Sequence, residues 1–538
     1  MPGCKGKTAH LGTFPLANPS PMKYSGTTML AKVYSGAVFG VEAFPVEIEV
    51  NTGGGDLNVI IVGLPDAAVR ESRDRVWTAM ANSGFQPPGG RTTINLAPAD
   101  VKKEGPSFDL PIAVATLISN NAVAADAADG YAMVGELALS GEVRRVRGVL
   151  PIALAMRRQG LANLLVPADN AEEAAVVEGI RIFPVRSLRQ AADFLNGETR
   201  IEPVALDLAA LRGRHSESIE DFVDVKGQET AKRVIEVAVG GGHNILMIGP
   251  PGTGKTMLAR RVVSILPDLT LDEALATTQI HSIAGILQAH QALVLRRPFR
   301  APHHTISDAG LLGGGVHPMP GEVSLAHHGV LFLDELPEFH RNVLEVLRQP
   351  LEEGHVTISR AAGSVTFPSR FMLVAAMNPC PCGYFGDPKR TCTCGSLKVQ
   401  NYRNRISGPL LDRIDLHIQV PAVRYQDMSG LAAGADSATI RARVQEARAV
   451  QQARFREQGG RVTCNAAMGA REVQRHCVLD AAAQSLLKMA MTEMNLSARA
   501  YDRLLKVART IADLDHSDRI RDLHIGEAIQ YRTLDRGL

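Results

Sequence analysis

The sequence predicts an α/β protein with three structured parts: a mixed α+β N-terminal domain, a core built on a parallel sheet, and a helical C-terminal lid. Three observations support this prediction. Short apolar runs and helical segments are mixed from Ala31 to about Leu195. Apolar strands separated by helical segments follow at residues 245–248, 330–333 and 371–375, a pattern typical of α/β cores. From Ala438 onward the pattern is almost entirely helical.

The domain borders follow from length and composition. The chain has 538 residues, too many for one hydrophobic core. Its 45% hydrophobic and 21% charged residues are ordinary for a globular protein, and a net charge of +2 gives no basic field over the whole molecule. We expect a disordered extension at 1–28, a first domain at 29–195, a linker at 196–219, a core at 220–425 and a helical lid at 426–538.

The sequence shows neither a secretory signal nor a membrane-spanning segment. Residues 1–28 are rich in Gly, Pro, Ser and Thr and lack the apolar stretch of a signal peptide. No apolar run reaches the roughly 18–20 residues of a transmembrane helix. We therefore expect a cytoplasmic protein without a membrane partner, in which the seven cysteines are reduced.

A glycine-rich loop of the pattern G-x-x-x-x-G-K-[ST] stands between an apolar strand at 244–248 and a helical segment at 257–266. The glycines let backbone N–H groups turn toward anionic oxygens, and the helix N-terminus adds partial positive charge. The lysine reaches the β- and γ-phosphates of a nucleotide, and the hydroxyl binds Mg²⁺. The sequence therefore predicts a site for ATP and Mg²⁺ made by Gly249, Pro250, Pro251, Gly252, Thr253, Gly254, Lys255 and Thr256.

Polar residues follow two further apolar strands, at the sheet edge where α/β proteins bind ligands. We expect Asp334 to hold Mg²⁺ and Glu335 to polarise the attacking water. Asn378 ends the next apolar strand and could orient the same water. The alternatives are a strand end with two solvated acids and a simple Asn378-Pro379 turn.

Taken in order, these motifs resemble an AAA+ ATPase module, in particular its magnesium-chelatase-like branch, which also contains helicase relatives. In such rings the nucleotide lies between subunits. The resemblance implies that Arg413 is an arginine finger for the neighbour's γ-phosphate and that Arg499 is the sensor 2 arginine of the helical domain. Alternatively, Arg413 pairs with Asp412 or Asp415. Arg503 lies only four residues after Arg499, so the sequence leaves open which residue is the sensor 2 arginine.

Residues 355–360 and 364–367 flank Ala361-Ala-Gly363 as the strands of a β-hairpin would. In related motors such loops point into the pore of the ring, which implies that Arg360 touches a phosphate backbone. A solvated arginine is the alternative.

Four cysteines within 15 residues form a metal-binding pattern. Cys380 and Cys382 precede a turn-rich loop of nine residues, and Cys392 and Cys394 follow it. Four thiolates on so short a segment suit a tetrahedral structural Zn²⁺, with free thiols or a redox pair as the alternatives. The histidines match no metal-site spacing, and we expect core or capping roles for those at 303, 304, 317, 327 and 328.

The N-terminal domain resembles Lon-type Ser-Lys proteases in two segments. Residues 98–107 are similar to their nucleophile loop, and residues 141–152 are similar to the segment before their general base. The resemblance implies a Lon-like fold.

The lysine that this chemistry needs is absent. Met156 stands where it should be, followed by Arg157. Methionine accepts no proton from Ser107, and arginine stays protonated. We therefore expect an inactive scaffold, such as a ring-forming or DNA-guiding collar, with Lys102 or Lys103 as the alternative base.

The Lon-like domain, the chelatase-type core, the paired cysteines and the sensor 2 helix occur in the order of the ComM (YifB) family, and the resemblance covers residues 29–538. It implies a hexameric, ATP-driven helicase that promotes DNA branch migration in homologous recombination during natural transformation, with single-stranded or branched DNA as its partner. Three alternatives stay open: the motor subunit of a magnesium chelatase, an ATP-dependent protease, and a non-enzymatic scaffold.

Overall fold

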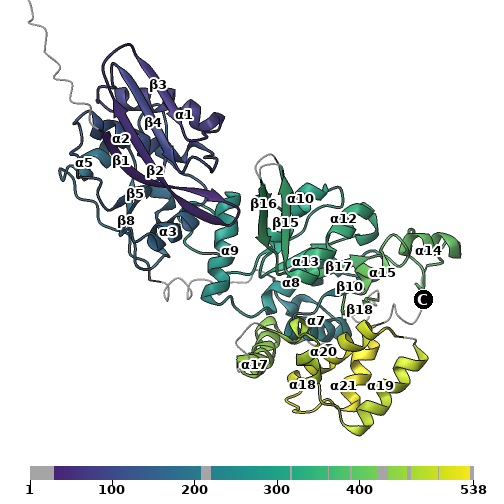
Figure 1. Ribbon diagram of the computed structural model, residues 1–538. Helices are drawn as coiled ribbons and strands as arrows, with labels where there is room; N and C mark the ends of the chain where they lie inside the picture. Colours follow the sequence, from purple (N-terminus) through teal and green to yellow (C-terminus); the bar gives the residue numbers. More distant parts are fainter. Residues whose placement is uncertain are drawn as a thin grey trace, which may run out of the picture.

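The computed structural model describes residues 30–207, 220–315, 318–360, 363–387, 390–421, 434–456, 462–494 and 496–532. The extension expected at 1–28, part of the linker expected at 196–219, and His317 lie outside these ranges. The described chain forms an N-terminal domain, a central core and a C-terminal group of helices (Figure 1).

The N-terminal domain is built on a seven-stranded sheet in the order β3-β4-β2-β1-β5-β8-β9. The pairs β1·β2 and β2·β4 are antiparallel, and the remaining pairs are parallel. Along β2, every second residue points to the same face, which buries Val46, Ile48 and Val50 completely. The strands are β1 (Leu30–Phe39), β2 (Glu42–Thr52), β3 (Asn58–Val62), β4 (Arg91–Ala97), β5 (Tyr131–Met133), β8 (Asn163–Pro167) and β9 (Arg181–Val185), with a small ribbon of β6 (Glu136–Leu137) and β7 (Val143–Arg144). The helices are α1 (Ala67–Asn82), α2 (Asp109–Ser119), α3 (Val149–Arg158), α4 (Ala171–Ala175) and α5 (Leu188–Leu195), with 3-10 turns η1 (Pro106–Phe108) and η2 (Ala168–Asn170).

The core is a five-stranded sheet in the order β11-β14-β17-β10-β18, in which every pair is parallel. Ile245 and Met247 of β10 belong to one apolar cluster, while Leu246 and Ile248 belong to another. The sheet is therefore buried on both faces, which explains why its strands are continuous apolar runs and confirms the predicted α/β class. The strands are β10 (Ile245–Ile248), β11 (Phe299–Arg300), β14 (Val330–Leu333), β17 (Met372–Met377) and β18 (Leu416–Gln419). The helices are α7 (Glu229–Gly241), α8 (Lys255–Ile265), α9 (Leu271–Ala284), α12 (Arg341–Val346), α13 (Arg348–Glu353), α14 (Ser396–Arg403) and α15 (Gly408–Leu411), with 3-10 turns η3 (Phe222–Asp224) and η4 (Leu336–Glu338).

Two small ribbons project from the core. The hairpin expected from the sequence is present as β15 (His355–Arg360) and β16 (Gly363–Pro368), paired antiparallel. A second ribbon of β12 (Gly313–Gly314) and β13 (Met319–Pro320) lies between the short helices α10 (Asp308–Leu312) and α11 (Glu322–Leu325).

The N-terminal domain rests on α9 and on the β15–β16 hairpin. The N–H of Gly148, at the start of α3, donates to Ser282 O of α9 at 3.2 Å. Ser282 Oγ in turn donates to Glu173, a buried carboxylate of the N-terminal domain. At the β1–β2 turn, Gly40 approaches the hairpin so closely that a Cβ there would lie 2.7 Å from Val365 Cγ1. The N-terminal domain therefore contacts the core through both α9 and the hairpin.

The C-terminal helices pack on the side of the core that carries α7 (Figure 1). They share one apolar cluster with β10, β17 and β18, to which α20 contributes Leu504, Ala508 and Ile511. Their bounds are α17 (Ser437–Arg456), α18 (Ala470–His476), α19 (Ala481–Glu493), α20 (Ala498–Leu514) and α21 (Asp522–Gln530), with a 3-10 turn η5 (Asn465–Ala467).

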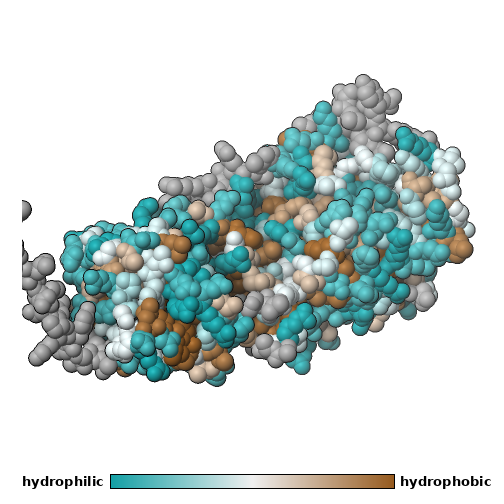
Figure 2. Space-filling model, turned by 90° about the horizontal axis from the view of Figure 1, so that it is seen from above, coloured by the Kyte–Doolittle hydropathy of each residue, from teal (hydrophilic) through white to brown (hydrophobic). Residues whose placement is uncertain are grey.

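Seen from above, most of the molecular surface is hydrophilic, and hydrophobic residues form scattered patches (Figure 2). Among the described residues, no helix is both long enough and apolar enough to span a membrane.

A buried carboxylate joins the C-terminal helices to the core sheet. Asp415 precedes β18 and accepts a hydrogen bond from the Asn244 N–H at 3.0 Å, while Arg503 of α20 lies at 3.3 Å. Burial alone would raise the pKa of Asp415, but the hydrogen bond from His243 and the charge of Arg503 outweigh burial and hold this pKa well below its ordinary value. Charge pairing thus adds to apolar packing in holding the lid.

Replacing Asp415 with Asn should destabilise the core and its lid by on the order of 3–5 kcal/mol, because the partly buried Arg503 then loses the carboxylate beside it. A carboxylate with a lowered pKa stabilises the folded state above its unfolded pKa of about 3.9 and loses this contribution as the pH falls below that value. The difference in urea unfolding midpoint between wild type and D415N should therefore be large at pH 7 and shrink toward about pH 3. The exposed Asp518→Asn is the control, and equal differences at both pH values would contradict the role of the charge.

Candidate nucleotide and metal sites

The glycine loop connects β10 to α8 in the conformation that an anion-binding loop needs. Gly252 and Gly254 have φ angles of 77° and 83°, which glycine adopts without steric cost. At Gly249, an added Cβ would lie 2.2 Å from the Val420 carbonyl oxygen, so no larger residue fits there. Because α8 begins at Lys255, the unpaired N–H groups of its first turn face the loop.

The lysine of the loop is buried and held by oxygen atoms. Lys255 Nζ donates to Gly249 O at 2.7 Å, to Pro250 O at 2.9 Å and to Asn378 Oδ1 at 3.3 Å. Burial lowers the pKa of Lys255, and two nearby carboxylates oppose this shift. The structure therefore places Asn378, the residue after β17, beside the lysine at the start of α8.

The two acids after β14 lie at the same edge of the sheet. Thr256 Oγ1 donates to Asp334 Oδ2 at 2.7 Å, and Asp334 Oδ1 accepts the N–H of Glu335 at 2.9 Å. Hydroxyl and carboxylate oxygens are the ligands that Mg²⁺ prefers, so these residues fit that ion. Glu335 has a φ of 51°, which is uncommon for a residue with a side chain and costs backbone energy. The Glu335 carboxylate faces His304: His304 Nδ1 lies 3.6 Å from Glu335 Oε2.

Three residues to which the sequence gave no catalytic role lie at this site. Gln228 donates to Thr253 O at 2.7 Å from a left-handed backbone conformation with φ of 59°. His304 contacts Glu335. The hydroxyl of Tyr402 accepts a hydrogen bond from the Asn378 N–H, and burial raises the pKa of Tyr402 to about 12. Of these three, only Gln228 had a local signal in the sequence, because it ends the segment Asp221-Phe-Val-Asp-Val-Lys-Gly-Gln228, which belongs to the resemblance to AAA+ modules.

The two arginines taken from the family resemblance make no bond to the glycine loop in the described part of the chain. Arg413 is 6% exposed and donates to Pro409 O and to Glu352, so its partner is neither of the two acids considered from the sequence. Arg499 is exposed near the start of α20. Within the part of the chain that the structure describes, no hydrogen bond or ion pair joins Arg413 or Arg499 to the loop.

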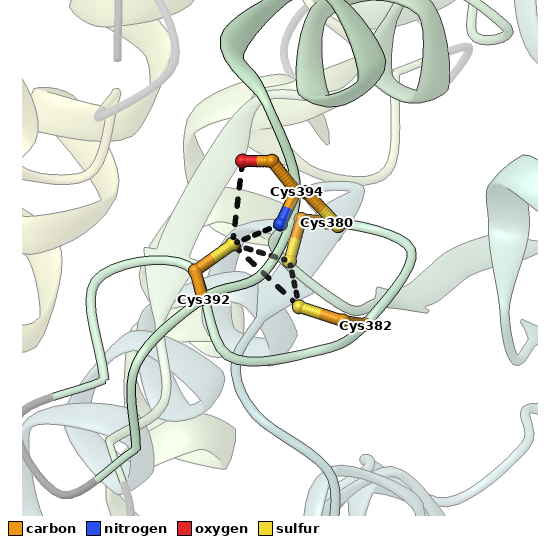
Figure 3. A group of neighbouring side chains, drawn as sticks. All are labelled: Cys380, Cys382, Cys392 and Cys394. Carbon is orange, nitrogen blue, oxygen red and sulfur yellow. Dashed lines mark hydrogen bonds between the residues drawn. The ribbon is translucent and has the colours of Figure 1, made fainter.

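The four cysteines come together in one cluster (Figure 3). Cys380 Sγ lies 3.3 Å from Cys382 Sγ and 3.7 Å from Cys392 Sγ, and all four sulfur atoms, including that of Cys394, lie within 4.8 Å of one another. A tetrahedron of Zn–S bonds of about 2.3 Å separates its sulfurs by about 3.8 Å. The four thiols therefore fit a zinc ion. Hydrogen bonding by the Tyr384 N–H lowers the pKa of Cys382 to about 5. The Cys394 N–H lowers the pKa of Cys392, but burial and the neighbouring thiols outweigh it and raise this pKa to about 12, so Cys382 is the first thiol of the cluster to ionise.

The cluster is attached to the nucleotide site. Cys380 follows Asn378-Pro379 directly, and a Cβ added to Gly383 would lie 2.7 Å from Pro251 Cδ of the glycine loop. Arg403 of α14 also donates to Pro379 O at 3.2 Å. The cysteine segment and the glycine loop thus pack as one unit.

In the N-terminal domain, the position expected for a catalytic lysine is filled with apolar side chains. Met156 is completely buried in α3. Lys103, an alternative base, is also buried, and its Nζ donates to Pro98 O and to Val101 O at 2.7 Å. Burial lowers the pKa of Lys103, but the ammonium is bound by carbonyl groups of its own loop.

Three family models match the chain in the order of its parts. "Subunit ChlI of Mg-chelatase" matches residues 46–170, "Magnesium chelatase, subunit ChlI" matches 221–428, and "Magnesium chelatase, subunit ChlI C-terminal" matches 434–532.

Several known proteins are similar to this chain along most of its length. Uncharacterized protein YifB of Escherichia coli is 43% identical over 509 residues, covering 94% of this chain and 98% of the relative. Competence protein ComM of Haemophilus influenzae is 43% identical over 512 residues, which also covers 94% of this chain and 98% of the relative. Magnesium-chelatase subunit ChlI of Cyanidium caldarium is 27% identical over 38% of this chain and 59% of its own length. The chain therefore belongs to the YifB/ComM family of magnesium-chelatase-like AAA+ proteins.

Proposed function

We propose that this protein is a ring-forming ATPase that acts as a DNA helicase and drives branch migration during natural transformation. The observation that carries the ATPase part is the meeting of three strand ends. Thr256 contacts Asp334 at 2.7 Å, and Lys255 contacts Asn378 at 3.3 Å, although these residues follow β10, β14 and β17. Such a convergence of a phosphate loop, acids and an amide suits phosphoryl transfer to water.

Each residue of this site has a distinct role in the proposal. The loop from Gly249 to Gly254 offers N–H groups to the phosphates, and Lys255 exchanges its carbonyl partners for their oxygens. Thr256 and Asp334 would hold Mg²⁺, which supplies charge neutralisation when bound. Glu335 accepts a proton from the attacking water, and Asn378 orients that water.

The ring assembly rests on the family resemblance. We assign Arg413 as the residue that reaches the neighbouring subunit's nucleotide and Arg499 as the sensor from the lid, in a hexamer. Because Arg413 is bound to the half-exposed Glu352 in the single chain, assembly would exchange this carboxylate for the γ-phosphate.

Two observations support DNA as the partner. A relative that is 43% identical along nearly its entire length is named Competence protein ComM. In the β15–β16 hairpin, the first strand ends at Arg360, which is exposed and can meet a phosphate backbone. We further propose that the N-terminal domain is an inactive Lon-like collar, since Met156 is buried where a protease needs a base.

A magnesium-chelatase motor subunit is the second candidate, because all three matching family models carry that name. This candidate requires a separate porphyrin-binding partner for activity. Stimulation of ATP hydrolysis by DNA alone would count against it.

Glu335→Gln should keep ATP binding and lower the turnover number by about 10²–10⁴-fold, because the amide cannot accept the proton of the water. Lys255→Ala should instead weaken nucleotide binding, since it removes the cation from the phosphate loop. Glu338→Gln, three residues beyond the active acid and paired with Arg405, is the matched control and should hydrolyse ATP like the wild type. Phosphate release assays and binding of a fluorescent ATP analogue separate these effects, and unchanged turnover in Glu335→Gln would contradict the assignment.

The wild type should move the branch point of a synthetic four-way DNA junction when ATP is supplied, and both Lys255→Ala and Glu335→Gln should fail. Binding of the junction should weaken as salt rises, because phosphate contacts release counterions. Gel separation of the strands after reaction measures the activity. If ATP hydrolysis is indifferent to every DNA tested and the junction does not bind at low salt, the DNA function is excluded.

The purified protein should contain about one Zn²⁺ per chain, held by Cys380, Cys382, Cys392 and Cys394. Cys392→Ser should release it, whereas Cys464→Ser, which changes a cysteine outside the cluster, should not. Elemental analysis together with thiol titration decides the question. Less than half an equivalent of zinc with all four thiols titratable would refute the site.

A further inference from the structure

The cysteine segment carries side chains that metal binding does not need. Between Cys382 and Cys392, the loop presents Tyr384 and Phe385, and helix α14 begins at Ser396, two residues after Cys394. Phe385 is 40% exposed, although a zinc loop requires only its ligands and turns. We call residues 380–387 and 390–403 the tetracysteine knob.

Arginine side chains contact the two aromatic rings of the loop between Cys382 and Cys392. The guanidinium carbon of Arg390 lies 5.0 Å from the centre of the Tyr384 ring, and Arg390 Nη1 donates to Tyr384 Oη at 2.7 Å. Arg403 Cζ lies 5.2 Å from the centre of the Phe385 ring. A guanidinium contact covers one face of a ring and fixes its orientation, so each ring is ordered before any ligand arrives.

Outside the cysteine cluster, the charged side chains of the knob are mostly cations, in a chain whose net charge is only +2. Its described residues include the cations Arg390, Lys398 and Arg403 and the single acid Asp387. Lys398 and Arg390 are exposed. Exposed hydrogen-bonding side chains lie among the cations, namely Thr391, Thr393, Ser396, Gln400 and Asn401.

Positive charge interleaved with accessible aromatic rings is the chemistry that recognises unpaired nucleotides. Bases stack on the rings, and the phosphates meet the arginine and lysine heads. A duplex keeps its base faces stacked inside and offers only phosphates to such a surface. We propose that the tetracysteine knob is a binding surface for single-stranded DNA, with Phe385 and Tyr384 as the stacking residues; this proposal rests on the proposed function and locates part of its substrate.

The place of the knob links this binding to nucleotide turnover. Gly383 packs on Pro251 of the glycine loop, and Pro379, which follows Asn378, accepts hydrogen bonds from Arg403. The arginine that contacts the Phe385 ring therefore also contacts the segment that positions the catalytic amide. A base stacked on Phe385 would act on the ATP site through one side chain.

The test uses the full chain, a fluorescein-labelled oligothymidylate of about 25 nucleotides, and a duplex of the same length, with fluorescence anisotropy as the readout. Phe385→Ala should weaken affinity for the single strand by about 5- to 100-fold and leave duplex affinity nearly unchanged. Phe385→Trp should keep the affinity, whereas Phe385→Leu, apolar but without a π face, should lose it. Met489→Ala, an exposed apolar side chain on α19, is the control. Zinc content and thermal unfolding show that each variant is folded.

The possible results separate the two proposals. If the wild type binds the single strand and Phe385→Ala binds it equally well, the knob is not the contact, and the proposed function stands. If the wild type binds neither DNA, the proposed function itself fails. If Phe385→Ala keeps its DNA affinity but changes the assembly size in light scattering, the knob is a contact between subunits, and our inference is overturned.

Discussion

The site depends on the register of three parallel strands. Ile248 of β10 pairs with Met377 of β17, and Leu333 of β14 pairs with Ala375, so the three strands end at nearly the same level. The residues that follow each strand therefore emerge together at one edge of the sheet. Because successive side chains of a strand point to opposite faces, a slip of one residue would exchange the two apolar clusters and separate Lys255 from Asn378. Burial on both faces makes such a slip expensive.

Features encoded within one short segment were predictable from the sequence. The loop before Lys255, the strand before Asp334 and the β15–β16 hairpin each consist of a local apolar pattern with its own turn residues, and the structure contains these elements. The family and the α/β class were likewise predictable, because the order of several motifs is far more specific than any one of them. The assignment of roles to Arg413 and Arg499 remains a prediction, since a single chain contains no neighbouring subunit.

Contacts between distant segments were not predictable from local patterns. Glu352 lies far before Arg413 in the chain, and only the packing of α13 beside the end of the sheet brings them together. The same holds for His304 beside Glu335 and for Gly383 against Pro251, since neither pair shares a pattern that spacing could reveal. The left-handed backbone of Gln228 is equally invisible in the sequence, because glutamine rarely adopts it.

The contacts between the N-terminal domain and the core have a consequence for experiments on truncated forms of this protein. Ala292 and Leu293 of the core are covered by Val176, and Ser282 donates to the buried Glu173. Removing the N-terminal domain would expose these apolar side chains to solvent and would leave the Ser282 hydroxyl without Glu173, its hydrogen-bond acceptor. A truncated core would then be prone to self-association for reasons unrelated to ring formation. Its oligomeric state would be a poor guide to that of the intact protein.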